Sequence, residues 1–192
     1  PKIANYHFTT LNPNLGVVDL DDAKGFVIAD IPGLIEGASE GVGLGHYFLR
    51  HIERTRLLVH VIDISGSEDR NPFEDFEIVN NELKNYGNKV ECLTQIVALN
   101  KIDLVDDENK ILEFKKKLSK LKKKYAVVEV SAVSNNNLDE LLTKIIEALK
   151  TLPSDEVHRA LLSDCGSKEA CIANVILKFI IERQRKAVPL AA

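Results

Sequence analysis

Hydrophobic residues along this chain form two kinds of pattern. Short runs rich in β-branched residues predict strands, and they lie at 15–20, 25–29, 57–64, 93–99 and 125–130. Apolar residues at three- and four-residue spacings predict helices, and these stretches cover about 44–54, 71–86, 107–123 and 138–149. Strands that alternate with helices predict a mainly parallel sheet covered on both faces. We therefore expect an α/β fold, built as a three-layer sandwich.

The pattern changes near residue 150. Thr151, Leu152 and Pro153 interrupt the last clear helical stretch, and 154–165 and 167–185 are typical of two further helical segments. We therefore divide the chain into residues 1–150 and a C-terminal segment, 151–192. We expect this second segment to be helical and packed on the first part.

Composition narrows the class of protein. Hydrophobic residues make up 45% and charged residues 28%, as in soluble globular proteins, and a net charge of −4 gives no general attraction to DNA. Three cysteines without a Cys-x-x-Cys pair indicate reduced thiols in a cytoplasmic protein. No apolar run reaches the length of a membrane span. Because the sequence opens with Pro1 and contains no methionine, we expect it to be a piece of a longer chain.

A candidate phosphate-sensing loop begins after the strand expected at 25–29. It opens with Asp-x-x-Gly, from Asp30 to Gly33, and is rich in glycine. A carboxylate at the carboxyl end of a buried strand is well placed to hold magnesium. The glycine lets its backbone N–H approach a terminal phosphate. Because such tetrads also arise by chance, Asp-x-x-Gly indicates a phosphate site only in combination with the motifs at later strand ends.

The tetrad Asn-Lys-Ile-Asp at 100–103 follows the strand expected at 93–99. The carboxylate of Asp103 would accept hydrogen bonds from N1–H and the 2-amino group of guanine, which adenine cannot supply. Asn100 would hold the loop and the edge of the ring, and the stem of Lys101 would lie over the face of the base. Ser131 and Ala132 come after a further strand, and their backbone N–H groups can donate to the purine carbonyl. Alone, the tetrad is more simply a strand end with turn residues, but together with Ser131 and Ala132 it favours a guanine site.

With these motifs in order, the chain resembles the Obg family of GTPases over about residues 1–150. Residues 8–18 and 30–56 are similar to the two switch regions of that family. The resemblance implies a P-loop GTPase-like fold, GTP or GDP and Mg²⁺ as cofactors, and a cytoplasmic switch protein of ribosome assembly and stress response. It also implies the large ribosomal subunit as a partner, with no role for DNA or a membrane.

The same resemblance implies roles for the residues nearest the phosphates. Thr10, with Thr9 as the alternative, would contact magnesium and the terminal phosphate. Asp30 would bind magnesium through water, and Gly33 would donate to the terminal phosphate. Leu34 stands where Ras-like enzymes have a glutamine that orients water. This apolar residue implies slow hydrolysis, with water placed by other groups.

One element of the family is not found in these residues. The phosphate loop, Gly-x-x-x-x-Gly-Lys-Ser/Thr, together with the strand before it, would precede Pro1. Two interpretations are open: a GTPase domain impaired as this fragment, or a module that binds no nucleotide and keeps its switch surfaces for docking to a ribosomal or protein partner.

The absent strand would lie centrally, between 25–29 and 57–64. The apolar run 172–181 is the one stretch without an assigned place, and we predict that it fills this position. It suits either a helix or a buried strand, and Ser167 as a cap favours the helix. We expect Ile176→Asp or Phe179→Asp to unfold the domain.

Lysines recur through 110–124 on a stretch that also carries a good apolar stripe. They are most simply the solvated face of an amphipathic helix. Contact with ribosomal RNA is the less favoured alternative.

Overall fold

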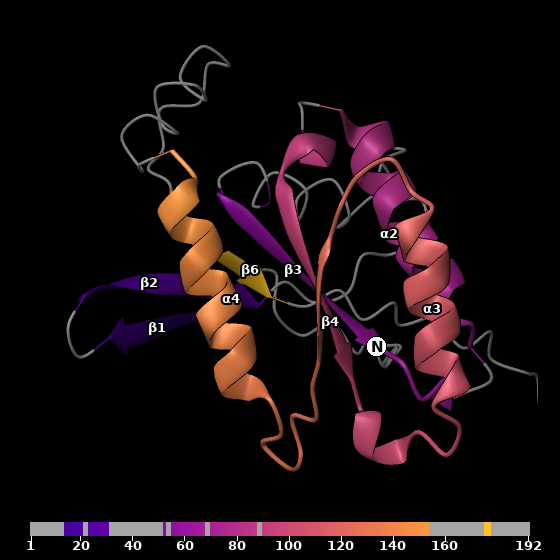
Figure 1. Cartoon of the computed structure of the whole chain (residues 1–192). Coiled ribbons are helices and arrows are strands. Elements are labelled where there is room, and N and C mark those ends of the chain that lie inside the picture. Colours follow the sequence, from indigo (N-terminus) through magenta and orange to yellow (C-terminus); the bar gives the residue numbers. More distant parts are fainter. Residues whose placement is uncertain are drawn as a thin grey trace, which may run out of the picture.

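A computed structural model describes residues 14–20, 23–30, 52, 55–67, 70–87, 90–153 and 175–177. The described strands form one six-stranded sheet with the order β1-β2-β6-β3-β4-β5 (Figure 1). The strands are β1 (Asn14–Leu20), β2 (Ala23–Asp30), β3 (Leu57–Asp63), β4 (Thr94–Asn100), β5 (Ala126–Glu129) and β6 (Val175–Leu177). Only β1 and β2 pair antiparallel, and the other neighbours are parallel. The mainly parallel sheet and the initial hairpin are confirmed.

Strand β6 occupies the centre of this sheet. It runs parallel to β2 on one side and to β3 on the other, with Ile176 opposite Ala29 and Leu58. The predicted position of this apolar run is therefore confirmed for its three described residues. The preference for a helix is wrong there, because a segment between two parallel strands satisfies its backbone groups by pairing with both. Phe179 and the rest of the segment beyond β6 lie outside the described residues.

Three longer helices are described: α2 (Pro72–Tyr86), α3 (Asn109–Ser119) and α4 (Leu138–Thr151). The side chain of Asn71 caps α2 by accepting hydrogen bonds from the N–H groups of Phe73 and Glu74, and proline occupies the first helical position. α2 and α4 lie where the apolar spacing predicts them. The helix expected at 44–54 lies outside the described residues except for Ile52, which is helical and buried.

Helix α3 is shorter than the predicted 107–123. It ends at Ser119, and the chain then turns toward the next strand. Lys123 Nζ donates to the carbonyl oxygens of Glu91 and Leu93, each at 2.7 Å. These bonds attach the end of the lysine-rich stretch to the entrance of β4. The lysines beyond Ser119 therefore do not continue the helix, although their propensity suits one.

The sheet lies between two helical layers (Figure 1). Successive side chains of β3 point to opposite faces, as strand geometry requires. Leu57 and Val59 pack with residues of α4, whereas Leu58 packs with residues of α2. A third cluster joins α2 and α3 around Phe76 and Phe114. The expected three-layer arrangement is thus present in the described part of the chain.

Arg56, just before β3, connects the sheet to the end of α4. Its guanidinium donates to the carbonyl oxygens of Leu149 at 2.9 Å and of Leu152 at 3.3 Å. The last carbonyls of a helix lack partners within it and carry partial negative charge, so a cation is favoured there. This contact fixes the C-terminal end of α4 against the sheet.

A buried histidine makes the fold sensitive to acid. His60 of β3 is fully buried and stacks on Phe76, with ring centroids 5.2 Å apart. Burial disfavours the imidazolium and lowers the pKa of His60 from 6.5 to about 3. The unfolded chain therefore takes up this proton first. The stability that depends on neutral His60 is complete above about pH 6.5 and is lost as the pH falls toward 3.

We expect the free energy of unfolding to fall by about 2 kcal/mol between pH 7 and pH 5 through His60 alone. Urea denaturation at the two pH values measures this change. The variant His60→Phe keeps a flat ring beside Phe76 and should show a smaller dependence on pH. An equal dependence in both proteins would contradict the assignment to His60.

Candidate functional site

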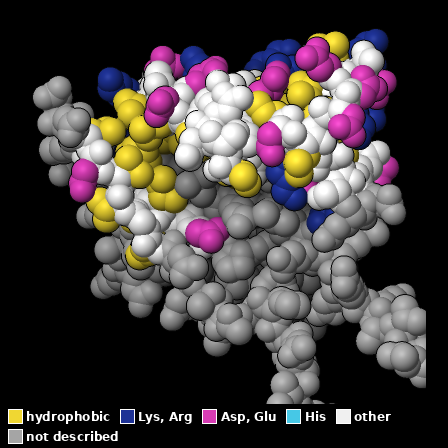
Figure 2. All heavy atoms as spheres, turned by 90° about the horizontal axis from the view of Figure 1, so that it is seen from below, with side chains coloured by type: hydrophobic (Ala, Val, Ile, Leu, Met, Phe, Trp, Pro, Cys, Tyr) yellow, Lys and Arg dark blue, Asp and Glu magenta, His cyan; other side chains and the backbone are white. Residues whose placement is uncertain are grey.

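Polar side chains gather where the parallel strands end. Asp30 is the last residue of β2, Asp63 the last of β3 and Asn100 the last of β4, while Ser131 comes shortly after β5. The register places Asp63 directly opposite Asn100. Because these strands are parallel, their carboxyl ends share one edge of the sheet, where such folds bind ligands. Figure 2 shows the molecule from this side, with acidic and basic side chains interspersed over the described surface.

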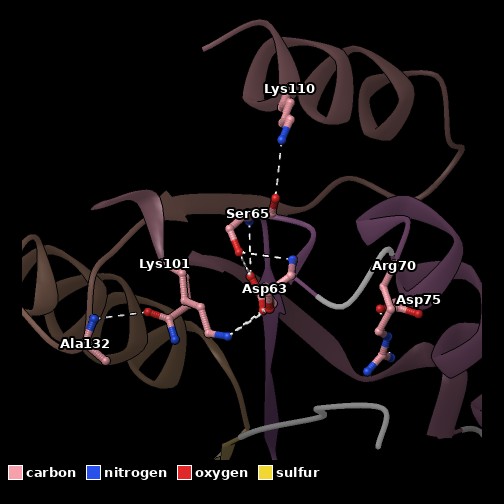
Figure 3. Close-up of polar contacts among 9 residues, drawn as sticks. Asp63, Ser65, Arg70, Asp75, Lys101, Lys110 and Ala132 are labelled. Atoms are coloured by element: carbon pink, nitrogen blue, oxygen red, sulfur yellow. Dashed lines mark hydrogen bonds and ion pairs between the residues drawn. The ribbon is translucent and has the colours of Figure 1, made fainter. Parts of the chain in front are cut away.

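Asn100 connects two of the predicted motifs. Its Oδ1 accepts a hydrogen bond of 3.0 Å from the backbone N–H of Ala132 (Figure 3). The loop that contains Ala132 is closed by two backbone bonds between Ser131 and Asn136, of 3.0 and 3.1 Å. This bond fixes the loop to the end of β4. In this structure the N–H groups of Ser131 and Ala132 already have acceptors within the chain.

Asp103 lies in a single 3-10 turn, η4 (Ile102–Leu104), and its side chain is exposed. Lys101 immediately precedes this turn and sets its direction. Its φ of 66° is left-handed, an uncommon conformation for a residue with a side chain. The N–H of Ile102 donates to the carbonyl oxygen of Val130 at 3.3 Å, which ties η4 to the end of the neighbouring strand. The turn that carries Asp103 is therefore fixed beside the end of β5, and the Asp103 side chain is open to solvent.

Lys101 forms an ion pair that the sequence does not predict. Its Nζ lies 2.6 Å from Oδ2 of Asp63 (Figure 3). Asp63 also accepts hydrogen bonds from the N–H of Ser65 at 3.1 Å, from the hydroxyl of Ser65 at 2.5 Å and from the hydroxyl of Ser67. The one local signal for Asp63 is its position as an acidic residue at the end of an apolar strand.

The surroundings of Asp63 keep it charged. Partial burial by itself raises the pKa of this carboxyl, but hydrogen bonds from Lys101, Ser65 and Ser67 and the charge of Lys101 outweigh that effect. The pKa of Asp63 therefore lies below its usual range. Asp63 is an anion at neutral pH, matched to the ammonium of Lys101.

Asp30 has a side-chain oxygen that no described residue satisfies. Its Oδ1 is buried and has no hydrogen-bond partner in the described part of the chain. Asp30 ends β2 opposite Leu177 of β6, so it lies beside the centre of the sheet. A buried carboxylate oxygen without a partner fits a hydrated divalent cation, which supplies both charge and donors. Thr10 and Gly33, the other predicted residues of this region, lie outside the described residues.

Comparison with known proteins assigns the family. Residues 1–101 match the family model described as 50S ribosome-binding GTPase. The chain belongs to this family. That assignment agrees with the position of the tetrad at 100–103, which lies at the carboxyl edge of a parallel sheet and is bonded to the loop after β5.

Relatives in this GTPase family include proteins named GTPase Obg. The one from Ruminiclostridium cellulolyticum is 58% identical over 153 residues, which is 80% of this chain and 36% of the relative. The one from Clostridioides difficile is 49% identical over 175 residues, 88% of this chain and 40% of the relative. The predicted resemblance to Obg is confirmed. The chain spans little more than a third of the length of these relatives.

A solved structure supports the fold. A variant of Era from Aquifex aeolicus, bound to GDP and AlF4⁻, aligns with a TM-score of 0.55 and 23% sequence identity. The alignment covers 76% of this chain and 46% of that one. The GTPase fold predicted from sequence is therefore confirmed. Within the described residues, no helix is both long enough and apolar enough to cross a membrane.

Proposed function

We propose that this chain is the guanine-nucleotide-binding domain of an Obg-like GTPase. The observation that carries the proposal is the hydrogen bond between Asn100 Oδ1 and the N–H of Ala132. It brings the tetrad at 100–103 and the loop at 131–137 together at one edge of the sheet. The two segments follow the ends of the neighbouring strands β4 and β5, and the side chain of Asn100 joins them directly.

The recognition chemistry depends on the groups at this edge. Asp103 is exposed and able to accept hydrogen bonds from N1–H and the 2-amino group of guanine. The aliphatic stem of Lys101 covers one face of the base. Asn100 holds the loop at the end of β4, and the N–H of Ala132 would be shared between Asn100 and the purine carbonyl. Adenine offers neither donor to Asp103 and would leave the carboxylate without a partner.

The phosphates and a magnesium ion would lie beyond the carboxyl end of β2. In this proposal Asp30 holds the ion through water, Thr10 contributes its hydroxyl and carbonyl, and Gly33 donates its N–H to the terminal phosphate. Magnesium, when bound, neutralises charge on the phosphate oxygens. The buried, unpartnered Oδ1 of Asp30 supports this assignment.

Hydrolysis by this chain is expected to be very slow. Leu34 has no group that could orient a water molecule, and the 192 residues contain no Gly-x-x-x-x-Gly-Lys-Ser/Thr segment. Phosphate neutralisation and water placement are therefore both weak. The family description, 50S ribosome-binding GTPase, supports a role of the whole protein at the large ribosomal subunit. The resemblance to Obg implies that this role belongs to ribosome assembly and stress response in the cytoplasm.

Titration with fluorescent GDP and ADP analogues tests the proposal on this chain. We expect weak binding with a clear preference for the guanine nucleotide, and phosphate release from GTP no faster than in buffer alone. Equal affinity for the two analogues would contradict a guanine site. No binding of either analogue would favour the alternative, a docking module that retains the switch surfaces without nucleotide.

A further inference from the structure

The ion pair between Asp63 and Lys101 joins two strand ends that are far apart in the sequence. Asp63 ends β3 and lies opposite Asn100, the residue before Lys101. A backbone bond of 3.1 Å from the N–H of Ile64 to the carbonyl oxygen of Asn100 continues the pairing past the last strand residue. The pairing of β3 with β4 therefore places the Asp63 carboxylate close to Lys101. The contact does not depend on a chance rotamer of an exposed side chain.

The carboxylate of Asp63 is organised around this contact. Oδ1 accepts from the N–H and the hydroxyl of Ser65, and Oδ2 accepts from the hydroxyl of Ser67 and from Lys101 Nζ. Lys101 Nζ also donates to the Ser67 hydroxyl oxygen at 3.2 Å. With both oxygens engaged, the carboxylate has little freedom to turn. The ammonium group of Lys101 is thus directed to one place on the β3 side of the tetrad.

We propose that Asp63 is a positioning residue for guanine-nucleotide binding, acting through Lys101. This inference rests on the proposed function, in which the stem of Lys101 covers the base. A free lysine side chain samples many rotamers, and ordering it on binding costs free energy. Asp63 fixes the ammonium end in advance, so the stem already lies along its bound path. Ser65 and Ser67 hold the carboxylate that does this.

A double-mutant cycle with fluorescent GDP tests the inference on the full 192-residue chain. Asp63→Asn keeps the size of the side chain but removes the charge that holds Lys101, and we expect about tenfold weaker binding. Lys101→Ala removes the group on which Asp63 acts. In that background, Asp63→Asn should change the affinity less than twofold.

A matched control is available elsewhere in the fold. Asp75 pairs with Arg70 at 2.9 Å, and its side chain is 24% exposed against 25% for Asp63. Asp75→Asn should leave GDP affinity unchanged. Thermal unfolding of each variant shows whether the substitution destabilises the fold. In the binding cycle, a purely structural role of Asp63 would weaken GDP binding equally with and without Lys101.

The outcomes distinguish this inference from the function on which it rests. Equal losses from Asp63→Asn in both backgrounds, or no loss in either, would overturn the role of Asp63 while leaving guanine binding intact. Absence of a guanine preference in the unmutated chain would overturn the proposed function and this inference with it. A loss seen only when Lys101 is present supports the positioning role.

Discussion

Asp103→Asn is expected to weaken GDP binding by roughly a hundredfold and to strengthen binding of xanthosine diphosphate. In the proposed site the carboxylate would accept from the two donors on one edge of guanine, whereas an amide would accept from only one and present a donor to the other. Xanthine has a carbonyl where guanine has its 2-amino group, so the amide suits it. Competition of each diphosphate against a fluorescent GDP analogue measures both affinities.

A nearby carboxylate provides the control for this experiment. Asp106 is exposed, as Asp103 is, but lies beyond η4 and outside the tetrad. Asp106→Asn removes the same charge from the same region and should leave the order of affinities unchanged. If Asp103→Asn and Asp106→Asn behave alike, the effect is one of net charge and Asp103 does not read the base.

Ile176→Pro is expected to destabilise the domain by about 3 kcal/mol or more. Ile176 is the middle residue of β6, which pairs with β2 and with β3. Whichever neighbour its N–H faces, proline removes that donor and its ring clashes with the ladder. Because a domain of this kind is stable by only about 5–15 kcal/mol, the loss is a large part of the total.

Chemical denaturation measures this loss against Ile176→Val. Valine keeps the backbone donor and the β-branched shape, so the Val variant should unfold close to the unmutated protein. The two variants differ mainly in whether the central ladder can form. Similar midpoints for Pro and Val would mean that β6 is not part of the cooperatively folded sheet.

The position of β6 was predictable from sequence, but its conformation was not. An apolar run rich in β-branched residues suited a central slot between two parallel strands, and no other run was left for it. A short apolar run has no clear period, because a buried strand and a buried helix are both apolar on every side. Ser167 was a local signal, and pairing with two neighbouring strands outweighed it.

The candidate site shows a similar division between local and long-range information. The tetrad at 100–103 and the pair Ser131 and Ala132 could be recognised because each is a contiguous pattern. Their contact through Asn100 could be expected from the parallel order of the strands. The link between Asp63 and Lys101 could not be predicted, because it depends on the register of β3 against β4, which no local pattern specifies.

The central place of β6 also has a consequence for synthesis on the ribosome. The strands on either side of β6 emerge early, but the segment that joins them emerges more than a hundred residues later along the chain, at 175–177. Within these 192 residues, β2 and β3 without β6 would expose unpaired edges toward each other, and such edges invite association with other chains. Pairing between residues so distant along the chain is also slow to form. Among the described strands of these 192 residues, the centre of the sheet is therefore completed by the pairings of greatest separation along the chain.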